Sequence, residues 1–181
     1  MKPQVTGVAV SAQDVAAIVT LVAEVEHAQQ NALPDAYLEL FRHDALWSAP
    51  YSSPLTGLDE IAAFARRMLP GTAGQPLTWA YEVESVQFIR SDIAAVKIRQ
   101  RPVTRDGERL DDLLRRPVDG SPRTGCRGPS EAVRRWAALV TAHPGEAPDT
   151  ALYVMAKTDG RWRIAVAQNT TAIEADTLTP A

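Results

Sequence analysis

The sequence of 181 residues has a single cysteine, Cys126. An intramolecular disulfide and a zinc site built on several cysteines are therefore excluded, and we expect the reducing cytoplasm as the compartment. Long hydrophobic runs are also missing, because the longest mostly apolar stretch, Val15–Ala23, has nine residues and a membrane-spanning helix needs about 20. Acidic residues on both sides of this stretch make it a poor secretory leader. We expect no contact with a membrane.

A strong net charge is absent as well. The 19 Lys and Arg residues stand against 22 Asp and Glu residues, a net charge of −3, so there is no general reason to bind nucleic acid. Aromatic residues make up only 6%, but a hydrophobic content of 45% is too high for a disordered chain. A chain of this length buries roughly 70% of its unfolded surface around one core. We therefore expect a single domain over residues 1–181.

Proline and glycine are unevenly distributed along the chain. Residues 101–150 hold six of the 13 prolines and five of the 10 glycines. Within them, residues 113–135 carry six arginines against Asp119 and Glu131, a local charge of +4. We interpret residues 105–148 as an insertion between two strands of one sheet, with a helix beginning at about Pro129.

Hydrophobic spacing predicts three helices in the first part of the chain. Apolar residues recur every three or four positions over about 12–30, after the helix-capping residue Ser11. Pro34 opens a second, short helix that has Phe41 on its apolar face. A short strand at 46–49 and a third helix within 57–70 follow.

Alternating patterns predict two antiparallel hairpins. Asp159-Gly160 is a strong hairpin turn, and Ser91-Asp92 separates the first pair of strands. The charges match if Glu84 lies opposite Arg99 and Glu82 opposite Arg101 on one face. The four predicted strands are Leu77–Arg90, Ile93–Arg101, Thr150–Thr158 and Arg161–Thr171.

Several short segments, in order along the chain, carry a family resemblance. They are Val25–Asn31, Leu33–Asp35, Leu40–Arg42, Asp44–Trp47, Leu55–Asp59, Leu69–Gly71, Tyr81–Glu84, Phe88–Arg90, Ala95–Gln100, Leu152–Lys157, Asp159–Trp162 and Gln168–Thr170. With this order of elements, the chain resembles the SgcJ/EcaC-type group of the SnoaL-like, nuclear-transport-factor-2-like (NTF2-like) superfamily. The resemblance covers roughly 12–104 and 150–172 and leaves out the insertion. It implies an α+β cone in which three N-terminal helices pack on a curved antiparallel sheet.

Such a cone encloses a concave, mostly apolar pocket, the usual place for a small-molecule ligand. Gln30, Gln100 and Gln168 interrupt faces that are otherwise apolar. Because a buried amide needs partners, these side chains either bond to one another and to the backbone or hold a ligand, and both alternatives stay open. The other ligand-binding candidates are Trp47, Tyr51, Phe64, Met68 and Tyr81. The alternative is that these are plain core residues, the commoner role of such side chains.

Glu26 is the candidate catalytic base. On the apolar face of its helix it would lose solvation, which makes a carboxylate a better general base; the alternative is a solvated or arginine-paired side chain. His27 lies at the edge of the same face and could assist Glu26. No His, Asp and Glu residues have the spacing of metal ligands, and no dinucleotide or flavin motif is present. We expect neither a metal nor a cofactor.

Together with the polar residues on apolar faces, the resemblance implies a small-molecule-binding protein of secondary metabolism, such as antibiotic biosynthesis. It would act on an apolar, polyketide-like ligand by acid–base chemistry: isomerisation, cyclisation or epoxide opening. The alternative is a non-catalytic carrier or accessory subunit that uses the arginine-rich insertion as its contact surface.

The outer sheet face is predicted to be half apolar, which suggests burial against a second subunit, and the resemblance also implies a homodimer formed through this sheet. The apolar residues placed on that face are Val86, Phe88, Ala95, Ala165 and Ala167.

Overall fold

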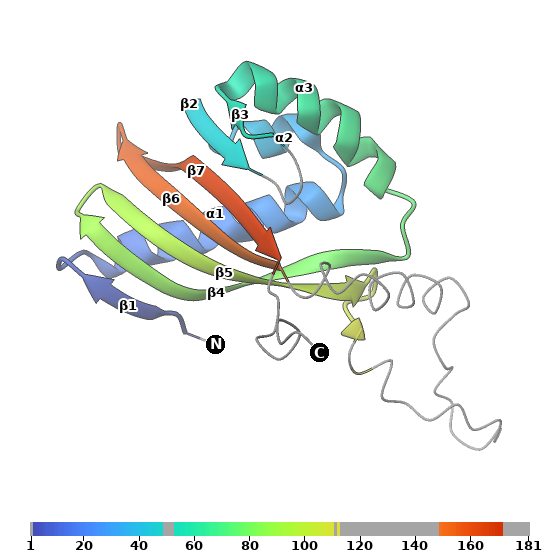
Figure 1. Ribbon diagram of the computed structural model, residues 1–181. Helices are drawn as coiled ribbons and strands as arrows, with labels where there is room; N and C mark the ends of the chain where they lie inside the picture. Colours follow the sequence, from blue (N-terminus) through green and yellow to red (C-terminus); the bar gives the residue numbers. More distant parts are fainter. Residues whose placement is uncertain (1, 49–52, 111, 113–148, 172–181) are drawn as a thin grey trace, which may run out of the picture.

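The computed structural model describes residues 2–48, 53–110, 112 and 149–171 (Figure 1). Tyr51, Cys126, the arginine-rich stretch and the helix predicted near Pro129 lie outside the described residues. The insertion is therefore described only where it begins, at residues 105–110 and 112.

The described strands form one curved sheet of seven, in the order β1-β4-β5-β6-β7-β2-β3 (Figure 1). Pairing is parallel between β1 and β4 and between β2 and β7, and antiparallel elsewhere. All four strands of the predicted hairpins are present, and β5 is longer than expected. The bounds are β1 Gln4–Gly7, β2 Phe41–Ser48, β3 Leu55–Thr56, β4 Leu77–Arg90, β5 Ile93–Thr104, β6 Asp149–Thr158 and β7 Arg161–Thr171.

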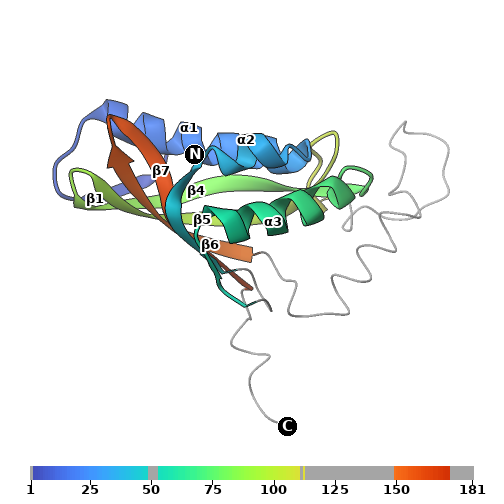
Figure 2. The same ribbon diagram turned by 90° about the horizontal axis from the view of Figure 1, so that it is seen from above.

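Three α-helices accompany the sheet, as predicted: α1 Ala12–Gln30, α2 Pro34–Leu38 and α3 Leu58–Met68, which runs into a short 3-10 helix, η1 Leu69–Thr72. The Ser11 side chain accepts a hydrogen bond from the backbone N–H of Asp14 and so starts α1. Helix α1 crosses one face of the sheet (Figures 1 and 2); we call this the concave face. Phe41 is not helical but begins β2, so the predicted short strand starts five residues early.

The core lies between α1 and the concave face. Directly paired residues of neighbouring strands point to the same face of a sheet. One such row runs across five strands and is buried throughout: Val86, Val96, Tyr153, Ala167 and Trp47. The apolar residues of α1, among them Ile18, Val22 and Val25, are buried in the same core cluster. The expected α+β cone is confirmed.

A β-bulge at Glu84 changes the register of the first hairpin. Glu82 lies opposite Arg99, and the ladder skips Glu84, because a bulge places two residues of one strand against one of the other. The expected charge pairs still form as diagonal contacts: Glu84 pairs with Arg99 and, at 3.0 Å, with Lys97, whereas Glu82 lies 3.8 Å from Arg101.

The same bulge corrects the predicted outer face. Beyond it Val86 and Phe88 lie on the concave side and are buried, so they do not contribute to an outer apolar surface. A second bulge, at Ala165 in β7, has the same effect on Ala167, which is buried in the concave row.

Arg105 anchors the beginning of the segment that follows β5, which the sequence predicts to be an insertion. Its guanidinium group donates hydrogen bonds to the backbone carbonyls of Gln30, Ala73 and Gln75. The last carbonyls of a helix have no partner within the helix, so Arg105 both closes α1 and ties it to the segment after η1. Among the described helices none is long and apolar enough to span a membrane.

Candidate functional site

Glu26 and Gln30 lie one helical turn apart on α1 and contact the edge of β4. Strand β1 covers β4 only from Ser85 to Phe88, so the backbone before Ser85 has an open edge. There the Tyr81 N–H donates to Glu26 Oε2 (3.1 Å), and Gln30 Nε2 donates both to the Trp79 carbonyl (2.9 Å) and to Glu26 Oε1 (2.9 Å). Both carboxylate oxygens of Glu26 are therefore occupied: Oε2 binds α1 to β4, and Oε1 holds the Gln30 side chain within α1.

Deeper on the concave face lies a group of buried polar atoms. Five buried side-chain atoms have no hydrogen-bond partner in the described part of the chain: Tyr37 Oη, Trp47 Nε1, Gln100 Nε2, Tyr153 Oη and Asn169 Oδ1. We call these residues the interior polar set. An unpaired buried donor or acceptor costs about 1 to 3 kcal/mol, and a whole domain is stable by only about 5 to 15 kcal/mol. Five of them together require an explanation.

Sheet register brings four of these side chains to one face from four strands, and α2 supplies the fifth. Trp47 of β2 and Tyr153 of β6 both pair with Ala167, which lies between them. Asn169 follows two residues later on β7, and Gln100 of β5 pairs with Tyr81. Tyr37 reaches the group from α2: its ring centre lies 6.1 Å from that of Trp47, which in turn lies 5.0 Å from that of Phe64.

Burial controls the chemistry of the two interior tyrosines. It raises the pKa of Tyr37 well above the usual value of 10.0. The nearby Tyr153 raises this pKa further, and the Gln29 side chain lowers it. Burial alone raises the pKa of Tyr153 far above its usual range. Both hydroxyls therefore stay protonated at physiological pH and are available as hydrogen-bond donors.

The other predicted candidates are divided between this face and the surface. Phe64 and Tyr81 are half-buried beside the interior polar set, and the Tyr81 hydroxyl donates to Gln29 Oε1. Met68, in contrast, is 50% exposed at the end of α3. His27 is exposed, and its ring Nδ1 lies 3.2 Å from Asn31 Nδ2. Tyr51 lies outside the described residues.

Gln168 does not reach the concave face, contrary to its predicted place beside Gln100. The bulge at Ala165 shifts the alternation of β7 by one residue, so Gln168 is exposed on the outer face and Asn169 points inward. Sequence reasoning therefore missed Asn169. It also missed Tyr153, whose alternation with the apolar residues Ala151 and Met155 was a usable signal, and treated Tyr37 only as part of an apolar face.

Within the described residues, no group of three or more His, Cys, Asp and Glu side chains could hold a metal ion. The interior polar set is uncharged and has mostly donors. It can bind oxygen acceptors of an otherwise apolar molecule and stabilise negative charge that develops on one of them.

No protein-family model and no curated protein matches the sequence. Solved structures do share the fold. A cystatin-like-fold protein from Nostoc punctiforme has 19% identity and a TM-score of 0.63, over 92% of this chain and 82% of its own. A ketosteroid isomerase-like protein from Erwinia carotovora atroseptica has 16% identity and a TM-score of 0.57, over 94% and 100%. A provisionally assigned scytalone dehydratase from Novosphingobium aromaticivorans has 13% identity and a TM-score of 0.58, over 93% and 91%.

These similarities establish the fold. Further neighbours are described as NTF2-like, one of them with a cystatin-like fold, so the NTF2-like cone expected from the sequence is confirmed. At such low identity the comparisons do not extend to the reaction or the substrate.

Proposed function

We propose that this NTF2-like chain binds an apolar, polyketide-like small molecule with several oxygen acceptors on its concave face. The observation that supports the proposal is the interior polar set. Four of its five unpaired atoms are donors once the tyrosines are protonated, so a matching ligand supplies carbonyl or hydroxyl oxygens. Because these atoms are buried, the ligand enters only when neighbouring side chains move aside.

We further propose acid–base chemistry on this ligand: isomerisation, cyclisation or epoxide opening, without a cofactor. Tyr37 and Tyr153 would stabilise the ligand oxygen that gains negative charge when a nearby proton is removed. The names of two structural neighbours, a ketosteroid isomerase-like protein and a provisionally assigned scytalone dehydratase, agree with chemistry on small organic molecules. Glu26 is the candidate base.

One observation favours the non-catalytic alternative, a ligand carrier. Glu26 Oε2 accepts the hydrogen bond from the Tyr81 N–H that attaches α1 to β4, and Oε1 accepts one from Gln30 within α1, which favours a positioning role for this residue. The arginine-rich insertion, the contact surface in this alternative, lies outside the described residues.

Ligand binding is tested by titrating 1,8-dihydroxyanthraquinone, an oxygenated aromatic ketone, into the protein and following fluorescence. We expect the unmodified chain to bind. Tyr153→Phe and Gln100→Leu should each bind about tenfold more weakly, because each loses one hydrogen bond to the ligand. Gln168→Leu, on the outer face, should bind as tightly as the unmodified chain. Removing an unpaired polar group should also raise the free energy of unfolding of the free protein by about 1 kcal/mol. The proposal fails if the unmodified chain does not bind, or if the interior variants bind equally well.

Catalysis is tested separately, by following deuterium uptake at the α-carbon of 2-tetralone in D2O by NMR. A positioned base typically contributes a factor of about 100 or more. If Glu26 is the base, the unmodified chain accelerates exchange, Glu26→Gln abolishes the acceleration, and Glu24→Gln, an exposed glutamate on the same helix, has no effect. Unaccelerated exchange by a chain that binds the anthraquinone supports the carrier.

We propose membership of the SgcJ/EcaC-type group and a role in antibiotic biosynthesis or related secondary metabolism, in the cytoplasm. This rests on the short matching segments, which contain Glu26 and Gln30 in one segment and Asn169 in another.

We also propose a homodimer through the outer sheet face. Register places five apolar side chains together there, and we call them the outer patch: Leu46, Ala95, Leu152, Val154 and Val166. Leu46 is 44% exposed and Leu152 is 48% exposed, which is typical of a surface covered by a partner.

A further inference from the structure

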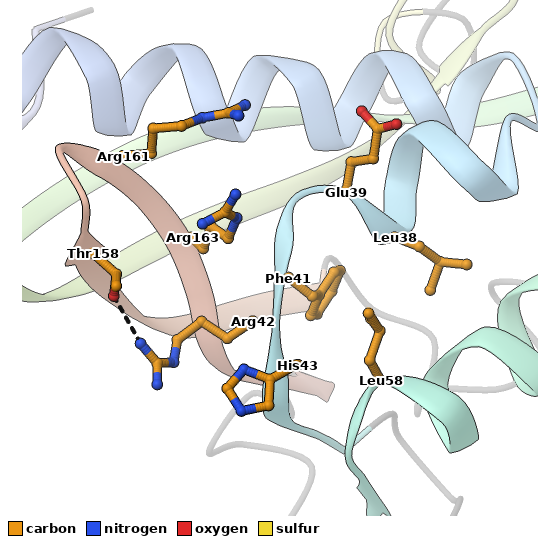
Figure 3. Close-up of a pocket in the computed structure, with 9 residues that line it drawn as sticks. All are labelled: Leu38, Glu39, Phe41, Arg42, His43, Leu58, Thr158, Arg161 and Arg163. Carbon is orange, nitrogen blue, oxygen red and sulfur yellow. Dashed lines mark hydrogen bonds between the residues drawn. The ribbon is translucent and has the colours of Figure 1, made fainter.

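A hollow of about 590 Å³ lies apart from the interior polar set, near the turn between β6 and β7 (Figure 3). It is formed where that hairpin meets the end of α2, the beginning of β2 and the beginning of α3. Its lining residues are Leu38, Glu39, Phe41, Arg42, His43, Leu58, Thr158, Arg161 and Arg163. The volume is in the range of about 300 to 1,000 Å³ that is usual for small-molecule sites.

Two of its three arginines are unpaired within the described part of the chain. Arg161 and Arg163 precede the first contact between β7 and β2, which is Phe41 opposite Ile164, so their segment of β7 has no neighbouring strand on that side. Neither guanidinium group has a hydrogen bond or ion pair with a described residue. An anion that enters the hollow would thus meet two arginines whose donors are not already used.

The third arginine, Arg42, is already paired. It donates to both carboxylate oxygens of Asp44 (2.8 and 2.9 Å) and to Thr158 Oγ1 (2.9 Å), as Figure 3 shows for Thr158. These bonds fix the wall of the hollow between β2 and β6. The charge of Arg42 is largely neutralised by Asp44, so the two β7 arginines are the ones left to attract an anion.

The floor of the hollow is apolar. Leu38 and Phe41 are buried and Leu58 is half-buried, and the three side chains lie together on one side of the hollow in Figure 3. Glu39 is the acidic residue of the lining. Its carboxylate points away from these three side chains, toward α1 (Figure 3), and Glu39 also lines a neighbouring hollow of about 400 Å³ together with Arg161.

We propose that this hollow binds a small organic anion, a carboxylate or phosphate ester with an apolar body. The anionic oxygens bind to Arg163 and Arg161, whose planar donor groups match carboxylate and phosphate geometry, and the apolar body packs on Leu38, Phe41 and Leu58. The chain as a whole is negative, so attraction of an anion here is local to the β7 arginines. This site is independent of the function proposed for the concave face.

Calorimetric titration tests the site with 4-phenylbutyrate, phenyl phosphate and the neutral amide 4-phenylbutyramide. We expect at least one anion to bind, and the amide to bind at least about tenfold more weakly than the carboxylate if the carboxylate binds, because it lacks charge-assisted hydrogen bonds. Arg163→Met should weaken anion binding by about tenfold or more, and Arg163→Lys by less. The matched control is Arg90→Met, which removes the same charge from an exposed arginine at the end of β4.

The proposal is overturned if Arg163→Met, verified as folded by circular dichroism, binds the anions as tightly as Arg90→Met. It is also overturned if the amide equals the carboxylate, or if inorganic phosphate binds as tightly as phenyl phosphate, since the apolar floor would then contribute nothing. Gln100→Leu separates the two sites: it should weaken binding of dihydroxyanthraquinone and leave binding of the anions unchanged. Equal loss of anion binding in Gln100→Leu would place the anion in the cone and end the proposal.

Discussion

Glu26 and Gln30 take the place of a strand at the open edge of β4. An uncovered strand edge leaves backbone donors and acceptors unpaired and invites pairing with other chains. Here the carboxylate receives the Tyr81 N–H and the amide donates to the Trp79 carbonyl. Two polar residues on the apolar face of a helix, which suggested a reactive site, are thus used to satisfy the backbone.

Asp14 illustrates a second residue whose charge serves the structure. Its carboxylate accepts hydrogen bonds from Lys157 Nζ (2.7 Å) and Trp162 Nε1 (3.0 Å) and also contacts Ser11. Lys157, then Ser11 and Trp162, lower the pKa of Asp14 from 3.8 to about 2. The first turn of α1 is in this way attached to β6 and β7.

We predict a pH-dependent loss of stability for Asp14→Asn. Because the folded-state pKa is depressed, the stabilisation by this carboxylate is complete above pH of about 4 and is lost as the pH falls toward 2. At pH 7 the variant should therefore have a free energy of unfolding lower by about 1 to 2 kcal/mol, with the difference shrinking below pH of about 4. Urea denaturation followed by circular dichroism at several pH values measures it.

Asp92→Asn is the control, because Asp92 pairs with Arg90 in an exposed turn and such pairs contribute about 1 kcal/mol or less. A difference between Asp14→Asn and the unmodified chain that stays constant from pH 7 to pH 2 would contradict the assignment.

At the level of elements, β1 depends on a glycine. Gly7 has a φ of +95°, and a Cβ at this position would collide with the backbone carbonyl of Phe88. The next residue, Val8, donates its N–H to the same carbonyl at 3.0 Å. The end of β1 thus approaches β4 too closely for any side chain.

We expect Gly7→Ala to detach β1 from β4 and leave the rest of the sheet intact. The reason is the collision together with the positive φ, which costs an L residue about 1 kcal/mol or more. Hydrogen exchange followed by NMR should show faster exchange at Val8, with the amides of β5 and β6 unchanged. Gly74→Ala is the control, because Gly74 has no heavy atom within 4 Å of an added Cβ. Unchanged protection at Val8 in Gly7→Ala would refute the account.

The elements that could be predicted are those whose conformation is set by adjacent residues in the sequence. The turn between β6 and β7 needs positive φ at both central residues, and Asp159 and Gly160 adopt φ of 52° and 77°. The bulges at Glu84 and Ala165 have no such signal, since each is a single extra residue whose position depends on the partner strand. Because of these bulges, Val86 and Phe88 point to the concave face, and Asn169 points there in place of Gln168. Alternation alone could not predict these orientations. Strand β1 was missed because its four exposed residues do not alternate.

The candidate site was partly predictable for the same reason. Tyr81 and Gln100 precede the bulge at Glu84, and Trp47 lies in the regular part of β2 after a register shift. Alternation therefore places these three side chains on the concave face, whereas it misplaces Asn169. The partner of each polar group depends on contacts between distant elements, such as Glu26 with Tyr81, and no spacing in the sequence encodes these.

For the whole molecule, the proposed dimer can be tested at the outer patch. We predict that the unmodified chain sediments as a dimer at micromolar concentration and that Leu152→Arg sediments as a monomer, because the interface would then bury an added positive charge beside Lys97, which lies opposite residue 152. Leu33→Arg, an exposed leucine between α1 and α2, is the control and should remain dimeric. A single 19.7 kDa species for the unmodified chain would exclude the dimer.

The parallel pairing of β2 with β7 also dictates the order in which the molecule can be completed. It joins residues 41–48 to residues 164–168, so Trp47 and its partners have no place to dock until synthesis has passed residue 168. Contacts between segments so distant in the chain form slowly. During that interval β2 exposes apolar side chains that the finished sheet hides, and the nascent chain is more exposed to aggregation.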